Sequence, residues 1–196
     1  MRVKEGVDKE ILDFWIDEVG EAGWYKASDD LDQQIRDRFE DTWHIAQKGA
    51  CHDWIACPDK SLALIILLDQ FPRNMFRGQA QAFASDRKAV EAALHAIDQR
   101  WDMRVAEPQR QFFYLPLMHS ENLTQQERCV RLLKTRMPET GAENLLHAKA
   151  HRMVIRLYGR FPYRNEALGR RTTEAEQRFM DQGGYGRIAE DMRAAA

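Results

Sequence analysis

The longest apolar run in the chain, from Leu62 to Leu68, lies inside the segment DKSLALIILLDQF at residues 59–71. Leu and Ala outnumber β-branched residues in this segment, which favours a helix, although a buried strand has the same continuous apolar pattern. Strand-like alternation occurs nowhere else in the sequence, so a strand here has no candidate partner. A helix that is apolar on every side must be surrounded by other elements. We therefore predict a central helix.

Amphipathic helical patterns account for most of the remaining sequence. Apolar residues recur at helical spacing, as in Leu31, Ile35 and Phe39, and residues 124–127 and 173–176 have the Thr-x-x-Glu spacing of a capping box. We predict an all-α fold of about eight or nine helices. Besides the central one, their segments are residues 7–23, 28–49, 51–57, 85–101, 107–120, 124–137, 143–159 and 173–184.

Length and composition indicate a single globular domain. The chain has 196 residues, of which 44% are hydrophobic and 31% are charged, a balance that is typical of folded proteins and argues against disorder. A chain of this length buries most of the surface that its unfolded form exposes. We predict one domain over residues 1–196, with a weakly anchored tail at residues 185–196.

The charge is small overall but unevenly distributed. The net charge of −2 predicts no general attraction to nucleic acid or to an acidic membrane. The segment Asp8–Glu40 has eleven acids and four bases, a balance of −7, whereas His151–Arg171 has six arginines and one acid, a balance of +5. We interpret these segments as faces that pack together or are solvated; a site for an acidic partner is the alternative.

Targeting and cofactor motifs are missing from the sequence. The three cysteines include no CxxC pair, and the first residues, MRVKEGVDKE, lack the apolar stretch of a signal peptide. The longest apolar run is far shorter than the ~20 residues that span a bilayer. There is no P-loop and no GxGxxG motif. We expect a cytoplasmic protein without a membrane segment, and we predict no cofactor.

One phrase follows the central segment and returns later in the chain. DQFPRNMFRG at residues 69–78 aligns loosely with GRFPYRNEALGR at residues 159–170. Proline disfavours helical geometry in the residue before it, so we predict that each helix ends at the Phe of its Phe-Pro pair. Gly78 and Gly169 then permit turns. We predict that both copies deliver polar side chains to one shared pocket.

Asp69 is the charge in this phrase that most needs an explanation. It lies near the C-terminal end of an apolar helix, where the helix dipole disfavours an anion and burial requires a cation. Arg73 and Arg77 are the nearest cations. One interpretation is a structural ion pair; the other is that Asp69 neutralises one guanidinium while others bind a carboxylate or phosphate. Arg160 and Arg164 bring the same chemistry from the second copy.

Three further side chains are candidates for acid–base chemistry: His119, Glu121 and His151. His119 and Glu121 are two residues apart before a predicted helix, and His151 precedes the second phrase. His147 and His151 have a spacing that is compatible with a metal site, but no HExxH motif accompanies them. We predict no metal site. The tryptophans and Tyr114 are assigned to the core.

Four motifs together carry a family resemblance: LALIILLDQFPRNMFRG, AFASD, FFYLPLMHSE and GRFPYRNEALGR. In this order they resemble the uncharacterised bacterial family named domain of unknown function 924, over about residues 11–184. The resemblance implies an α-helical superhelix similar to tetratricopeptide repeats, and it brings no known activity. Where the family's FPxRN phrase is expected to have histidine, this chain has Tyr163. The polar motif positions are Asp69, Gln70, Arg73, Asn74, Arg77, Asp86, His119, Glu121, His151, Arg160, Arg164 and Asn165.

Three hypotheses for function follow. The first is a small enzyme or ligand-binding protein that holds an anionic metabolite in an arginine-rich, helix-lined pocket, with His119, Glu121 and His151 as acid–base groups. The second is a tetratricopeptide-like module that clamps a peptide partner through its arginines. The third is that the motif charges form a purely structural ion-pair network. Oligomeric state stays open.

Overall fold

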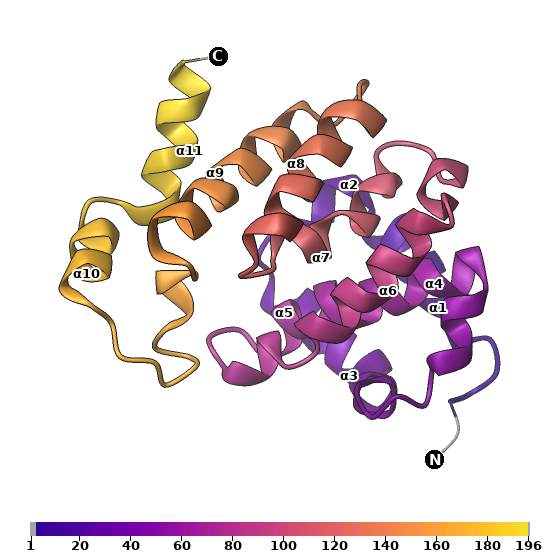
Figure 1. Cartoon of the computed structure of the whole chain (residues 1–196). Helices are drawn as coiled ribbons and strands as arrows, with labels where there is room; N and C mark the ends of the chain where they lie inside the picture. Colours follow the sequence, from indigo (N-terminus) through magenta and orange to yellow (C-terminus); the bar gives the residue numbers. More distant parts are fainter. Residues whose placement is uncertain (1–2, 196) are drawn as a thin grey trace. The chain divides into compact units, whose positions relative to one another are not determined.

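The computed structural model describes residues 3–195, and every regular element among these residues is helical, with no strand (Figure 1). The predicted all-α fold is confirmed. When α1–η1–α2 and α4–η3–α5 are each counted as one continuous helix, residues 3–195 form nine helices, besides short 3₁₀ turns. No helix in this part of the chain is both long enough and apolar enough to span a membrane.

The chain forms two compact units, one up to Pro116 and the other from Leu117 onward, and each is described by itself. That the whole chain is one domain stays a prediction. The first unit contains α1 (Val7–Leu12), η1 (Asp13–Val19), α2 (Gly20–Gly23), α3 (Asp29–Gln47), η2 (His52–Ala56), α4 (Pro58–Ile65), η3 (Ile66–Gln70), α5 (Phe71–Met75), η4 (Ala80–Phe83), α6 (Asp86–Asp98), η5 (Trp101–Arg104) and η6 (Gln109–Phe113). Helix α7 (Leu115–Met118) crosses the boundary, and the second unit continues with α8 (Leu123–Arg136), α9 (Ala142–Tyr158), η7 (Pro162–Arg164), α10 (Glu174–Asp181) and α11 (Gly184–Ala194).

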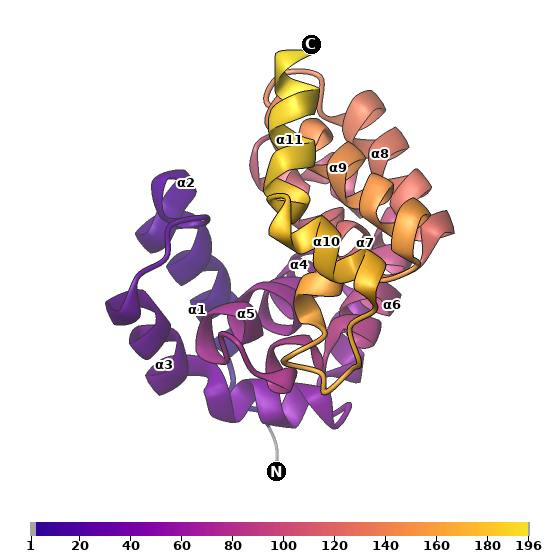
Figure 2. The same ribbon diagram turned by 90° about the vertical axis from the view of Figure 1, so that its left-hand side faces the viewer.

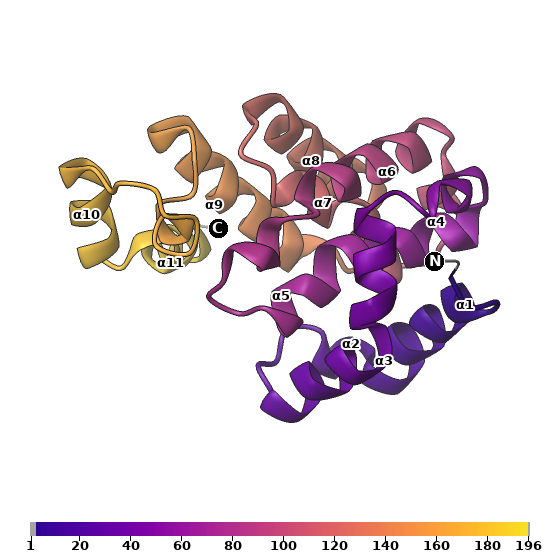
Figure 3. The same cartoon turned by 90° about the horizontal axis from the view of Figure 1, so that it is seen from below.

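The apolar run forms the central helix of the first unit, as predicted. Every residue from Ser61 to Gln70 is buried. Helix α4 packs against α1 and α6, and α5 packs against α3 (Figure 3). The ring of Phe71 lies 4.8–6.1 Å from the rings of Phe14, Trp15 and Phe39, measured between centroids. These aromatic side chains form the middle of the unit's core.

The central helix does not end at Phe71, so that prediction is wrong for the first copy of the phrase. Phe71 has α geometry, and the helix continues through Pro72 to Met75. The π-helical turn η3 lies directly before the proline, and proline can donate no hydrogen bond to the carbonyl of Leu68 four residues earlier. Ser85 Oγ donates to that carbonyl over 2.6 Å. A side chain at the start of α6 thus donates the hydrogen bond to this carbonyl that Pro72 cannot donate.

The second unit is built on α8 and α9, which lie side by side (Figure 1). Its buried cluster consists of Val154, Ile155 and Phe161, which Tyr158 and Phe179 partly cover. Helix α11 packs along α9 where the sequence predicted a weakly anchored tail (Figure 2). The last residue of the expected tail, residue 196, lies outside the described residues.

In the second copy of the phrase, the helix ends before the proline. Gly159 caps α9 at a left-handed φ of 70°, so the helix stops at Tyr158, and Phe161 is extended, as a residue before proline prefers. Gly78 and Gly169 both have positive φ, at 74° and 61°. The predicted glycine turns are therefore confirmed in both copies.

Candidate functional site

Asp69 is fully buried and is paired with Arg73, one of its two predicted partners. Arg73 Nη1 lies 3.1 Å from Asp69 Oδ1 and also donates to the Asp69 carbonyl oxygen, while Arg73 Nη2 donates to Asp86 Oδ1 over 2.9 Å. Gln70 Nε2 donates to Asp69 Oδ2 over 2.6 Å. Four of the predicted polar positions therefore form one cluster around the end of η3.

Arg77, the other candidate partner of Asp69, pairs instead with Asp32 of α3. Arg77 Nη2 donates to Asp32 Oδ1 over 2.9 Å, and Arg77 Nε also donates to this carboxylate. Asn74 Nδ2 donates to Asp32 Oδ1 over 2.8 Å. Burial alone would raise the pKa of Asp32, but Arg77 and Asn74 hold that pKa below its ordinary value. Asp32 therefore stays ionised and ties α5 to α3.

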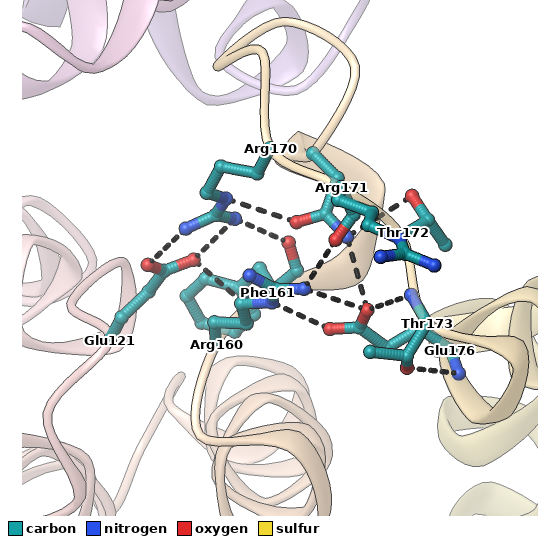
Figure 4. A network of polar contacts seen from close by, with 9 residues as sticks. Glu121, Arg160, Phe161, Arg170, Arg171, Thr172, Thr173 and Glu176 are labelled. Carbon is teal, nitrogen blue, oxygen red and sulfur yellow. Dashed lines mark hydrogen bonds and ion pairs between the residues drawn. The ribbon is translucent and has the colours of Figure 1, made fainter.

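The second phrase meets a carboxylate in the same way, this time Glu176 of α10 (Figure 4). Arg160 donates to Glu176 through Nε over 2.6 Å and through Nη2 over 2.8 Å, and Asn165 Nδ2 lies 3.4 Å from Glu176 Oε2. The backbone N–H of Thr173 donates to Glu176 over 2.8 Å, which completes the predicted capping box. Arg160 and Thr173 lower the pKa of Glu176 to about 2.

Glu121, a predicted acid–base group, belongs to the same network (Figure 4). Arg170 grips both of its oxygens, over 2.7 and 3.0 Å, and the Phe161 N–H donates to Glu121 Oε1 over 2.7 Å. Burial would raise the pKa of Glu121, but Arg170 and the Phe161 N–H hold it below its ordinary value. Arg170 also donates to Asn165 Oδ1 over 3.0 Å. This carboxylate is thus held as an ion that joins two loops.

The two phrases therefore have the same structural role, each within its own unit, although their backbone geometries differ. In each copy, the asparagine amide and a nearby arginine bind one buried carboxylate that comes from a distant helix, Asp32 or Glu176. These interactions are structural, as the third hypothesis expects. The residues that make them are Arg77, Asn74, Arg160 and Asn165. Their binding of a ligand stays a prediction, as does the shared pocket, because the phrases lie in different units.

Asp32 and Arg170 are members of these networks that were not among the predicted site residues. Asp32 stands in an acidic first turn, where acids are common for dipole reasons alone, so nothing marked it out. Arg170 is the last residue of the second phrase, and its position beside Gly169 is the available signal. Glu176 had been noted only for its capping-box spacing.

A hollow of about 570 Å³ lies in the second unit, and the predicted acid–base group His151 is among the residues that line it. His151 Nδ1 lies 2.9 Å from the carbonyl oxygen of His147, so Nδ1 carries the proton and Nε2 keeps its lone pair. The ring of His151 lies 4.5 Å from that of Tyr185, between centroids. The residues that line the hollow are His151, Tyr163, Met180, Gly183, Gly184 and Tyr185.

The surroundings of His151 keep its imidazole neutral. The ring retains some exposed surface, but the protein around it removes most hydration from the imidazolium form. This desolvation lowers the pKa of His151 to about 3, and electrostatic repulsion from His119 and from the Arg164 guanidinium adds to the effect. Arg164 is itself buried, stacks over the Phe161 ring at 4.6 Å, and donates to the His119 carbonyl oxygen over 2.9 Å.

His147 and His151 do not converge on a common point, despite their spacing. His147 Nδ1 contacts the Tyr185 hydroxyl and its Nε2 lies 3.2 Å from Glu143 Oε1, whereas His151 Nδ1 faces the backbone. Among residues 3–195, no three His, Cys, Asp or Glu side chains are grouped as metal ligands. His119 lies with its ring 6.3 Å from that of His151, between centroids, and its catalytic role stays a prediction.

These features define an all-helical protein with three carboxylate-centred ion-pair networks and a hollow lined by His151. The chain belongs to the family described as bacterial protein of unknown function (DUF924), whose model matches residues 11–184. The chain is also similar to the solved structure of a protein of unknown function from Agrobacterium tumefaciens, with 37% sequence identity and a TM-score of 0.83. That match covers 90% of this chain and 97% of the other. No curated protein matches the sequence.

Proposed function

We propose that this protein binds an anionic small molecule in the hollow beside His151, with the neutral imidazole as a hydrogen-bond acceptor. One observation carries this proposal: His151 Nδ1 is fixed by a backbone carbonyl, so Nε2 is the basic nitrogen left for a ligand in the hollow. Because its pKa is about 3, the ring is a neutral acceptor at physiological pH.

The sign of the local charge supports an anion as the ligand. Arg164 lowers the pKa of His151, so the imidazole lies in the positive field of that guanidinium. A field that disfavours an imidazolium favours a carboxylate or phosphate at the same place. Tyr163 lines the hollow with a phenol group, which can donate a hydrogen bond to an anionic oxygen. The peptide-binding alternative stays a prediction without a comparable observation.

The test is a titration of the full-length chain with inorganic phosphate at constant ionic strength, followed through the ring resonances of His151 by nuclear magnetic resonance. We expect a saturable shift of the His151 signals. The variant His151→Asn keeps an N–H donor near the position of Nδ1 but removes Nε2. It should abolish saturable phosphate binding, which is followed in parent and variant through the ring resonances of Tyr163 and Tyr185. The matched control His52→Asn changes an exposed histidine of the first unit and should bind as the parent does. A non-saturating shift that sodium chloride reproduces would overturn the proposal.

A further inference from the structure

Tyr185 stands at the inner end of a chain of polar contacts that runs from the surface to the hollow. Its hydroxyl is hydrogen-bonded to His147 Nδ1, and His147 Nε2 lies 3.2 Å from Glu143 Oε1. Glu143 also pairs with Arg193 of α11. The side chain of Glu143 is 60% exposed and that of His147 is 36% exposed, while Tyr185 lines the hollow. Protons can therefore enter or leave at Glu143.

The order of these groups determines which nitrogen of His147 carries the proton. His147 Nε2 faces the Glu143 carboxylate, so the neutral ring has its N–H on Nε2, and Nδ1 then accepts the hydrogen bond from the Tyr185 hydroxyl. A carboxylate, an imidazole and a hydroxyl in this order can activate the hydroxyl, because the imidazole accepts its proton and the carboxylate stabilises the resulting imidazolium. His151 has the opposite tautomer, since its Nδ1 donates to a carbonyl.

We propose that Glu143, His147 and Tyr185 form a proton relay, in which the Tyr185 phenol oxygen is the acid–base group of the hollow. The inference rests on the proposed function, since the proton is exchanged with the anion bound beside His151. As the phenol oxygen takes a proton from the ligand, the O–H bond of Tyr185 breaks and a new N–H bond forms at His147 Nδ1. Tyr185 is neutral after this step, and His147, now an imidazolium, becomes neutral again when its Nε2 proton passes to Glu143 or to water.

The two aromatic groups at the hollow then have different tasks. The neutral imidazole of His151 directs its Nε2 lone pair toward the ligand, while Tyr185 exchanges protons with solvent through His147. Their rings lie 4.5 Å apart between centroids, so one small molecule can touch both. Burial raises the pKa of Tyr185, so its phenol keeps its proton until the relay removes it. The substrate class is an anion with an acidic C–H or O–H group.

The relay can be tested without any ligand, by acetylation of the full-length chain with N-acetylimidazole. When the Tyr185 oxygen attacks the acetyl carbon, the C–O bond forms, the bond from carbon to the reagent's imidazole breaks, and the phenol proton passes to His147. Mass spectrometry of peptides gives the rate at each tyrosine. His147→Asn places an amide oxygen near the position of Nδ1, which still accepts a hydrogen bond but cannot take the proton.

We expect His147→Asn to slow acetylation of Tyr185 at least about tenfold, since a positioned general base contributes about 10²–10⁴-fold. Tyr163, which lines the same hollow and is 45% exposed, is the internal control and should react at the parent rate. Glu143 lies at the surface, so Glu143→Gln should leave the fold intact. It should slow the acetylation of Tyr185 by a smaller factor than His147→Asn does.

If the acetylation rate of Tyr185 in both variants stays within twofold of the rate in the parent protein, the proposed relay is overturned. This result is independent of the phosphate titration, because acetylation requires no anion in the hollow. Loss of phosphate binding with an intact relay would overturn the proposed function, whereas phosphate binding with an unchanged Tyr185 rate would overturn the relay.

Discussion

Replacing Glu176 with Gln should destabilise the second unit strongly, because this buried carboxylate holds three partners. Its side chain is 4% exposed and accepts hydrogen bonds from Arg160, Thr173 and Asn165. Breaking a buried ion pair costs about 3–5 kcal/mol when the remaining charge has no access to water. The Arg160 side chain is 28% exposed and can be hydrated, which reduces the expected loss below that range, to about 2–3 kcal/mol.

The assay is urea denaturation of the full-length chain, followed by far-ultraviolet circular dichroism. All five tryptophans lie between Trp15 and Trp101, so their fluorescence separately reports on the first unit. The control is Glu174→Gln in the same first turn of α10. The Glu174 side chain is 94% exposed and lies 3.7 Å from Arg178, so its replacement should cost less than about 0.5 kcal/mol.

The difference between parent and Glu176→Gln should also depend on pH. The folded-state pKa of about 2 lies below the ordinary value of 4.5, so the carboxylate stabilises the fold above pH 4.5. This stabilisation is lost as the pH falls from 4.5 toward 2, and the two proteins should converge there. A loss below about 0.5 kcal/mol at neutral pH, or a difference that is unchanged at pH 3, would refute the reasoning.

Two further substitutions test the backbone features of the fold. Ser85→Ala removes the partner of the Leu68 carbonyl and of the Trp43 indole N–H, 2.9 Å away, and should lower the free energy of unfolding by about 1–3 kcal/mol, measured by urea denaturation followed through tryptophan fluorescence. A loss in the free energy of unfolding below about 0.5 kcal/mol, half of the lower bound, would contradict the role given to this hydroxyl. Gly159→Ala puts a side chain at φ 70° and should cost about 1 kcal/mol, whereas Gly186→Ala, inside α11 with open space around it, should stabilise by about 0.4–1 kcal/mol. Equal melting temperatures for the two glycine variants would count against this account.

The fold could be predicted from sequence wherever the signal was local. The central helix follows from a continuous apolar run, and the capping box of α10 from two residues three apart. Asp69 and Arg73, which form an ion pair, are four residues apart, about one helical turn. The same logic fails for α8, because Asn122 rather than Thr124 caps it, and both residue types suit that position.

Long-range partners of the candidate site could not be predicted in this way. Asp32 and Arg77 are 45 residues apart in the chain, and the Ser85 hydroxyl reaches a carbonyl 17 residues away. No spacing rule links such residues, because the contact exists only after the helices have packed. Tyr185 was missed for a related reason: it follows two glycines, and only the packing of α11 on α9 brings it to His147.

The paired charges and the hollow have different chemistry, because the residues that line the hollow carry uncharged rings. The arginines of the two phrases bind carboxylates within their own units, and this places Arg160 and Arg77 in the scaffold. His151, held neutral with a fixed tautomer, is the group on which the proposed function depends.

The most direct test of this account is the protonation of His151, followed by nuclear magnetic resonance of its ring nitrogens from pH 8 downward. We predict a neutral ring with its proton on Nδ1 and a midpoint near pH 3, and a stability that falls by about 1.4 kcal/mol per pH unit below 6.5 because the unfolded state binds a proton first. The charged and titratable groups that face the ring are His119, His147, Tyr163, Arg164 and Tyr185. A His151 midpoint near 6.5, or a proton on Nε2, would contradict the account.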